Sequence, residues 1–131
     1  MKVLALDYGA ARTGVAVSDP TGTLARPLEV VERASGKAGL ARLAELVRLE
    51  GAERIVVGLP LTLRGEHGAQ AQETERFVEA LRRVVSVPIE SFDERFTTAL
   101  AGQDAGGAAE DARAAAHLLT SYLEWTKSHS A

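Results

Sequence analysis

The order in which short apolar runs follow one another limits the folds open to this chain more than any other feature of its sequence. The first 32 residues hold three such runs, at residues 2–7, 15–18 and 25–31. Glycine-containing turns separate them, and runs joined by short turns of this kind are typical of antiparallel hairpins. We therefore expect an antiparallel meander of three strands at the start of the chain.

After residue 32 the pattern changes to alternating helices and strands, which is typical of parallel pairing. The sequence therefore predicts an α/β fold with a mixed five-stranded sheet, three antiparallel strands followed by two parallel ones, flanked by helices. The expected elements are a helix capped by Ser35, a strand at 54–60, a polar loop at 61–68, a helix through about Val84 with Phe77, Leu81 and Val84 on one face, a strand at 87–94, a flexible loop at 102–109 and a helix from about Glu110 to Trp125.

Composition excludes several classes of protein. The chain has 131 residues, so we expect a single compact domain over 1–131. It contains no cysteine, which excludes disulfides, thiolate zinc sites and a cysteine nucleophile. No run approaches the roughly 18 apolar residues of a membrane helix, and we expect a cytoplasmic protein with no membrane partner. The net charge of −3 argues against a general nucleic-acid coat protein.

Acidic residues stand at the ends of two predicted strands. Asp7 ends the first strand, and Asp93 and Glu94 end the last, which should run parallel to it. Because ligands in α/β sheets bind beyond the carboxyl ends of parallel strands, we expect these carboxylates to meet at one edge. Asp111 lies on the apolar stripe of the last helix, where it could join them or interact with the helix dipole.

Carboxylates that converge on a partly buried point repel one another, and a divalent cation relieves that repulsion. Oxygen ligands suit Mg²⁺ or Mn²⁺, and nothing here offers soft ligands. Two such ions could support hydrolysis of a phosphodiester bond.

Four stretches of the chain carry recognisable motifs: Leu6–Asp19, Val56–Leu61, Asp93–Thr98 and Asp111–Leu119 with Tyr122 and Leu123. In order and spacing these motifs resemble those of the YqgF/RuvX family of RNase H-like nucleases. The resemblance implies a nuclease that processes the 5′ end of pre-16S rRNA, and the family is also similar to Holliday junction resolvases. It implies catalytic acids at Asp7, Asp93, Glu94 and Asp111, with metal held by Asp7, Glu94 and Asp111. By analogy with related resolvases we favour Glu94 over Asp93 as the metal ligand. Asp93 would then support the site without contacting the metal, or pair with an arginine.

Several residues near the acidic set are candidates for binding substrate. Arg12, in the first hairpin loop, is a candidate phosphate clamp, and Arg64 in the polar loop could touch substrate together with Gln70. Arg95 could hold a phosphate or form a salt bridge with Asp93. The remaining candidates are Thr97 and Thr98, which could bind phosphate or cap the next helix, and His67, the histidine best placed for proton transfer.

Nucleic acid is the predicted partner, and four functions compete. The first is a nuclease acting on structured RNA, the pre-16S rRNA. The second is a resolvase of four-way DNA junctions, which would be a two-fold dimer. The third is a nucleotide-binding module, because the loop from Asp7 to Gly14 resembles the first phosphate loop of actin-like ATPases. Those proteins use two such domains, which a chain of this length lacks. The fourth is a ribosome-assembly factor without catalytic activity.

Overall fold

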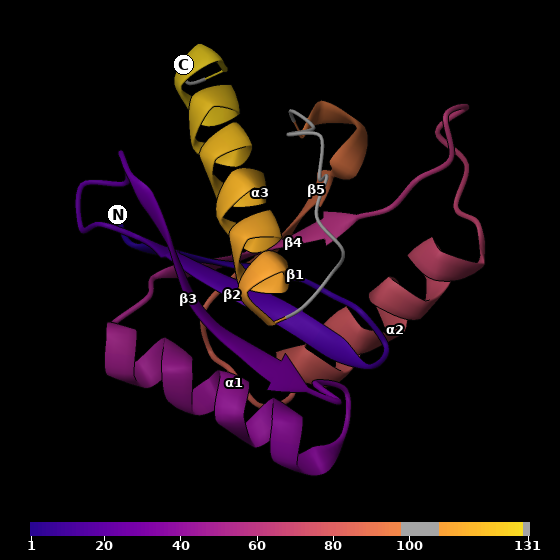
Figure 1. Cartoon of the computed structure of the whole chain (residues 1–131), viewed down its shortest axis with the longest axis horizontal. Coiled ribbons are helices and arrows are strands. Elements are labelled where there is room, and N and C mark those ends of the chain that lie inside the picture. The colour runs from indigo at the N-terminus through magenta and orange to yellow at the C-terminus, as the bar shows by residue number, and fades with distance from the viewer. Residues whose placement is uncertain (98–107, 130–131) are drawn as a thin grey trace.

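The computed structural model describes residues 1–97 and 108–129, which build one five-stranded sheet with helices on both faces. The strand order is β3-β2-β1-β4-β5, and Figure 1 shows the sheet crossed by the C-terminal helix. The elements are β1 (Val3–Asp7), β2 (Arg12–Ser18), β3 (Ala25–Glu32), α1 (Lys37–Glu50), β4 (Arg54–Leu59), α2 (Ala69–Arg82), β5 (Ile89–Asp93), the 3₁₀ turn η1 (Glu94–Phe96) and α3 (Ala108–Ser128).

Strand pairing follows the predicted pattern. β1 pairs antiparallel with β2, which pairs antiparallel with β3, and β1–β4 and β4–β5 are parallel. The prediction of three antiparallel strands followed by two parallel ones is therefore confirmed. The carboxyl ends of β1, β4 and β5 lie together at one edge of the sheet.

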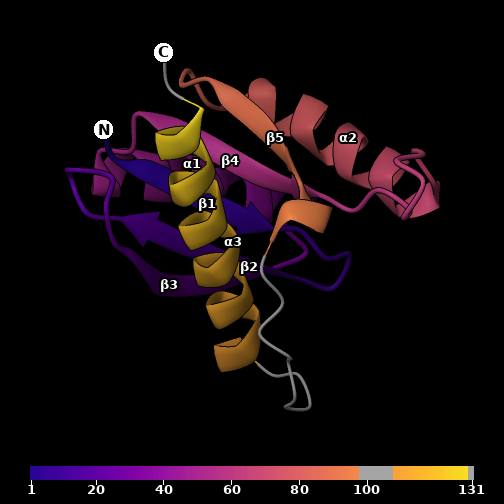
Figure 2. The same cartoon turned by 90° about the horizontal axis from the view of Figure 1, so that it is seen from above.

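The two faces of the sheet carry separate cores, because alternate residues of a strand point to opposite faces. Leu4 and Leu6 of β1 pack with residues of α1 and α2 such as Leu43 and Phe77. Val3 and Ala5 face the other way and pack under α3. Figure 2 shows α3 on one side of the sheet with α1 and α2 on the other. This arrangement brings α3 to the face on which Asp7, two residues after Ala5, also lies.

Several predicted details of the helices were wrong. Ser35 does not cap α1: the cap is Gly36, which makes no side-chain hydrogen bond. Gly39 in the first turn of α1 lies close to the preceding backbone, since a Cβ atom there would collide with the carbonyl oxygen of Arg33. Val84 does not lie on the buried face of α2. That helix ends at Arg82, and Val84 is 43% exposed beyond it.

Two further boundaries differ from the prediction. Arg12 is not in the hairpin loop but is the first residue of β2, paired with Glu32 of β3. The last helix begins at Ala108, inside the predicted loop at 102–109. The rest of that loop lies outside the described residues, as does Thr98. Among the helices that the structure describes, none is long and apolar enough to cross a membrane.

Candidate active site

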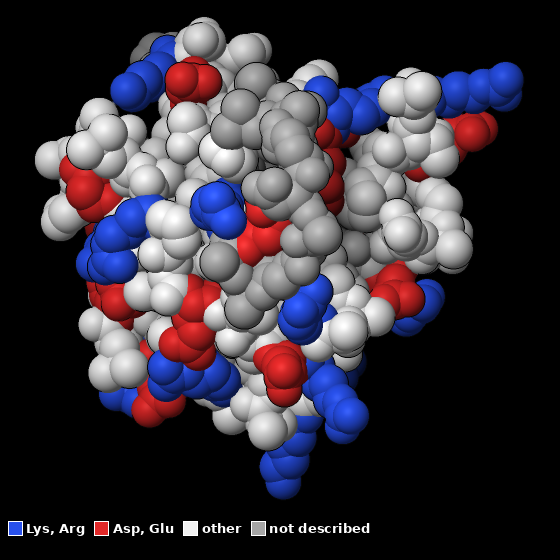
Figure 3. Space-filling view, viewed as in Figure 1, with Lys and Arg blue, Asp and Glu red and all other residues white. Residues whose placement is uncertain are grey.

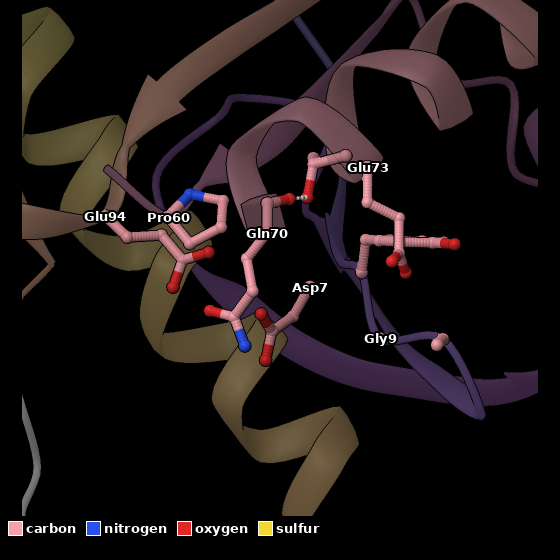
Figure 4. A pocket seen from close by; sticks show the side chains of 9 residues that line it. Asp7, Gly9, Pro60, Gln70, Glu73 and Glu94 are labelled. Atoms are coloured by element: carbon pink, nitrogen blue, oxygen red, sulfur yellow. Dashed lines mark hydrogen bonds between the residues drawn. The ribbon is translucent and has the colours of Figure 1, made fainter. Parts of the chain in front are cut away.

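A pocket lies at the edge of the sheet where the parallel strands end. Its volume is about 330 Å³, and Figure 4 shows the carboxylates of Asp7 and Glu94 in it. Asp7 is the last residue of β1, and Glu94 follows β5 directly. The lining residues are Asp7, Tyr8, Gly9, Ala10, Pro60, Gln70, Glu73, Thr74 and Glu94.

Two glycines make room for the acidic side chains. A Cβ atom on Gly58 of β4 would lie 3.0 Å from Cγ and Oε2 of Glu94, so the Glu94 side chain occupies the space that a larger residue would fill. Gly14 of β2 is paired with Asp7, and a Cβ atom there would collide with the backbone carbonyl of Asp111. The first turns of α3 can therefore approach the strand next to Asp7.

Burial raises the pKa of both pocket carboxylates. The pKa of Asp7 is raised to about 6, first by burial and then by the nearby charge of Asp111. The pKa of Glu94 is raised to about 7 by burial, followed by the charges of Asp7 and Asp93. Within residues 1–97 and 108–129, neither Asp7 nor Glu94 forms a salt bridge. Their mutual repulsion is therefore not offset by a basic side chain in the described parts of the chain.

Asp111 differs from these two acids because it has a basic partner. Arg12 Nε lies 2.9 Å from Asp111 Oδ2. This contact is an ion pair only, since Asp111 Oδ2 is buried and accepts no hydrogen bond of acceptable geometry. The three carboxylates are electrostatically coupled through Asp7. They are not drawn together around one point, because no group of three metal-ligating side chains is assembled among the described residues.

Asp93 and Glu94 were expected to be neighbours in one strand, but β5 ends at Asp93 and Glu94 begins the 3₁₀ turn η1, which Asp93 caps by accepting a hydrogen bond from the backbone N–H of Arg95. Asp93 turns to Arg95, whose Nε lies 2.9 Å from Asp93 Oδ2 and lowers the pKa of that carboxyl. Arg95 also donates from Nη1 to the carbonyl oxygen of Leu63 at 3.2 Å. Of the two alternatives for Arg95, the structure contains the salt bridge with Asp93. The hydrogen bond to Leu63 ties the loop 61–68 to η1.

The remaining candidates lie at different distances from the pocket. Arg64 is exposed in the loop 61–68, and His67 is also exposed there, with its Nδ1 3.2 Å from a carboxylate oxygen of Glu75. Neither lines the pocket. Thr97 follows η1, and its Oγ1 is buried without a hydrogen-bond partner among the residues that the structure describes.

Helix α2 supplies three pocket residues, Gln70, Glu73 and Thr74, and sequence reasoning named only the first of them. Gln70 was a candidate, and its side chain extends from α2 in the direction of Asp7 (Figure 4). Glu73 was missed, although a signal existed. Residues 70, 73, 74 and 77 follow the i, i+3, i+4, i+7 spacing of one helix face, and Phe77 was already assigned to the core.

The donor set fits a divalent metal ion. Asp7 and Glu94 offer only carboxylate oxygens, which Mg²⁺ and Mn²⁺ prefer, and their pKa values are raised by burial and then by the charges of neighbouring acids. A cation held by these carboxylates would offset the repulsion between the acids, and Asp111 is near enough to Asp7 to raise its pKa.

Two solved structures share this fold. One is "T. thermophilus RuvC in complex with Holliday junction substrate", with a TM-score of 0.69 over 100% of this chain and 98% of that chain, at 20% identity. The other is "Thermus thermophilus RuvC structure", with a TM-score of 0.61, 98% and 97% coverage and 19% identity. At these identities the likeness concerns the fold alone, and it places the protein among the RNase H-like folds.

Sequence comparison identifies the family. The family model described as "RuvX: Holliday junction resolvase" matches residues 1–125, so the chain belongs to the RuvX family, as the motifs predicted. Relatives named "Putative pre-16S rRNA nuclease" support this assignment. One from Chloroflexus aggregans is 48% identical over 77% of this chain and 71% of that protein. Others come from Rubrobacter xylanophilus (47% identical; 94% and 92%) and Desulforudis audaxviator (41% identical; 98% and 97%).

Proposed function

We propose that this protein is a cytoplasmic, single-domain, divalent-metal-dependent nuclease that hydrolyses phosphodiester bonds in the 5′ leader of pre-16S rRNA. One observation carries the proposal: Asp7 and Glu94 share a pocket at the sheet edge, and their pKa values are raised to about 6 and about 7 with no salt bridge to a described residue. Because unpaired, partly buried carboxylates destabilise a fold, their presence here favours a role in binding a cation. The relatives' names point to the RNA substrate.

Asp7 and Glu94 would hold the metal ions, Mg²⁺ or Mn²⁺, with Asp111 as a further ligand. When bound, two such ions would activate the attacking water and stabilise the charge of the phosphate in the transition state. The protein contributes the fixed strand ends that position these carboxylates, because side chains on rigid elements are held more precisely than those on loops.

Other side chains at the pocket can orient the substrate. Gln70 presents an amide to the Asp7 side of the pocket and can donate to a phosphate or a ribose hydroxyl. Arg64 is exposed on the loop 61–68 and can reach a phosphate outside the pocket. Figure 3 shows acidic and basic side chains interspersed on the face that carries α3. Metal ions would therefore supply part of the positive charge that holds the backbone of the nucleic acid.

The proposal is tested by a cleavage assay with the purified protein. Three substrates are compared, a pre-16S 5′ leader RNA, an unstructured single-stranded RNA and a four-way DNA junction, each with Mg²⁺, Mn²⁺ or EDTA. We expect metal-dependent cleavage of the leader RNA and its loss in Asp7→Asn and Glu94→Gln. Cleavage that persists in EDTA or in both variants would exclude this site.

Cleavage of four-way DNA junctions is the second candidate, favoured by the description of the family model. A resolvase makes paired cuts and would work as a two-fold dimer. Sedimentation at the assay concentration, together with paired nicks on the junction substrate, would support it. A monomer that cuts only the leader RNA would favour the rRNA function.

A further inference from the structure

Arg12 and Asp111 form the one ion pair of the described chain that involves a candidate metal-binding carboxylate, with Arg12 Nε 2.9 Å from Asp111 Oδ2. The paired oxygen is buried and accepts no well-aligned hydrogen bond, so charge rather than hydrogen-bond geometry holds the contact. Among the described residues, the positive charge of Arg12 therefore balances the negative charge of Asp111, whereas no salt bridge does so for Asp7 or Glu94.

The backbone fixes this pair beside Asp7. Gly14 faces Asp7 in the β1–β2 pairing and allows the backbone of Asp111 to approach, and Arg12 lies two residues before Gly14 on the same face of β2. The guanidinium of Arg12 consequently lies on the side of the sheet on which Asp7 and α3 also lie.

We infer that Arg12 is an exchangeable counter-charge: it occupies Asp111 in the free protein, and a divalent cation displaces it, so that its guanidinium becomes available for a substrate phosphate. The inference rests on the proposed function, because the cation and the phosphate are those of the nuclease reaction. Arg12 would then compete with the metal for the Asp111 carboxylate, which a residue that only binds phosphate would not do.

A divalent cation can displace Arg12 from Asp111 at little steric or energetic cost. The Arg12 side chain is 43% exposed, and the Asp111 side chain is 29% exposed. Ion pairs with this degree of exposure contribute little to stability, and a divalent cation carries twice the charge of a guanidinium. Arginine also binds phosphate in a bidentate manner once its fork is free. Metal would thus bind before Arg12 takes the phosphate, which orders the two events.

The sign of one measurement separates this role from a structural one. If Arg12 competes with metal, its removal tightens metal binding. If Arg12 holds Asp111 in position for the metal, its removal weakens metal binding. Mn²⁺ affinity is measured by calorimetry on the full chain without nucleic acid, for the wild type, Arg12→Gln, Asp111→Asn and the double variant. We expect Arg12→Gln to tighten Mn²⁺ binding on the order of threefold, an effect of the size of one exposed ion pair.

The double variant identifies the cause. In the Asp111→Asn background the substitution of Arg12 should no longer change Mn²⁺ affinity, because the competition requires the carboxylate. Arg113→Gln is the matched control, since it removes an equal charge from α3 at a residue that pairs with Glu110 at 3.5 Å. The inference is overturned if Arg113→Gln tightens Mn²⁺ binding as much as Arg12→Gln does. It is also overturned if Arg12→Gln tightens Mn²⁺ binding equally in the wild-type and Asp111→Asn backgrounds, because either result would mean a general effect of removing positive charge. Unchanged or weaker binding in Arg12→Gln would also overturn it.

A second measurement follows the release of Arg12. Binding of a leader RNA is measured by fluorescence anisotropy in EDTA and in Ca²⁺, which also prefers oxygen ligands. Arg12→Gln should weaken binding several-fold more in Ca²⁺ than in EDTA, where Arg12 is held by Asp111. An equal loss in both would contradict the inference. If the wild type binds Mn²⁺ but Arg12 has no effect, this inference alone fails. If the wild type binds no Mn²⁺, the proposed function fails with it.

Discussion

A Cβ atom placed on Gly58 would lie 3.0 Å from both Cγ and Oε2 of Glu94. The end of β4 therefore leaves empty the space into which β5 and η1 deliver their carboxylate. Gly14 has the corresponding relation to Asp111 on the other side of Asp7. The acidic site is consequently shaped as much by two missing side chains as by the carboxylates themselves.

The close approach of Gly58 to the Glu94 side chain predicts that Gly58→Ala reduces catalysis without unfolding the protein. The added methyl group meets the flexible end of Glu94 rather than backbone, so the carboxylate must shift by a few tenths of an ångström or more. Because displacement of a reacting group by about 1 Å can cost on the order of 100-fold in rate, we expect kcat to fall at least about tenfold. Cleavage rates and thermal melts of the variant measure the two effects.

Gly68→Ala is the control for this substitution. A Cβ atom at Gly68 would lie 3.7 Å from the Thr62 methyl group, which is an ordinary contact. We expect near wild-type cleavage from Gly68→Ala. A Gly58→Ala variant that cleaves at the wild-type rate would show that Glu94 does not need its present position.

Gly14→Ala should act on stability instead. Its Cβ atom would overlap the carbonyl oxygen of Asp111 in the backbone of α3, which cannot move as a side chain can. Overpacking of this kind costs about 1–3 kcal/mol, and we expect the upper part of that range. Urea denaturation measures the loss. An unchanged midpoint would mean that α3 can move away from β2 at little cost.

Much of the fold could be predicted because it depends on local patterns. The apolar run that ends at Asp7 and the run at 54–60 are buried strands, and their order fixed the mixed sheet. The positions of Asp7 and Glu94 at one edge followed from strand ends alone. The pairing of Asp93 with an arginine was one of the two roles expected for that residue, and Arg95 provides it.

The rest depends on contacts between distant segments, which a local pattern does not contain. The pairing of Arg12 with Asp111 joins residues almost a whole chain apart, and Arg12 could be placed only once β2 was known to begin there. Glu73 reads as a surface residue of α2 until the helix is docked beside β1. The Ser35 cap was wrong by one residue, since Gly36 is the cap of α1, and residue preferences alone do not fix a helix boundary to one position.

Arg95→Ala should loosen the loop 61–68 rather than simply weaken phosphate binding. Arg95 donates to Asp93 and to the Leu63 carbonyl oxygen, so its loss frees both. We expect faster proteolysis within 61–68 and a loss of stability of about 1 kcal/mol, the size of one or two partly exposed hydrogen bonds. Asp93→Asn should produce a similar change, and the double variant should be little worse than either. Additive losses would contradict the shared role.

Metal affinity should rise with pH through the range in which the pocket acids lose their protons. The pKa values of Asp7 and Glu94 are raised to about 6 and about 7, and metal binds the deprotonated carboxylates. We expect Mn²⁺ affinity to increase between about pH 5.5 and 7.5 and then level off, with proton release on binding. Calorimetry in buffers of different ionisation enthalpy measures that release. Affinity independent of pH over this range would exclude both acids as ligands.

In EDTA the same two acids should lower stability as pH rises. Their pKa values in the folded state lie above the ordinary values of 3.8 and 4.5, so between about pH 4 and 7 the folded protein binds more protons than the unfolded chain. Stability contributed by the protonated acids is therefore lost as pH rises through this window.

Asp7→Asn removes one of the repelling charges, and we expect it to be more stable than the wild type by about 1–2 kcal/mol at pH 8 and nearly equal to it at pH 4. Saturating Mn²⁺ should reverse the order at pH 8, because only the wild type retains the ligand. Urea denaturation of both proteins at the two pH values, with EDTA and with Mn²⁺, measures each term. An Asp7→Asn variant that is less stable in EDTA at pH 8 would mean that the carboxylate already has a stabilising partner without metal.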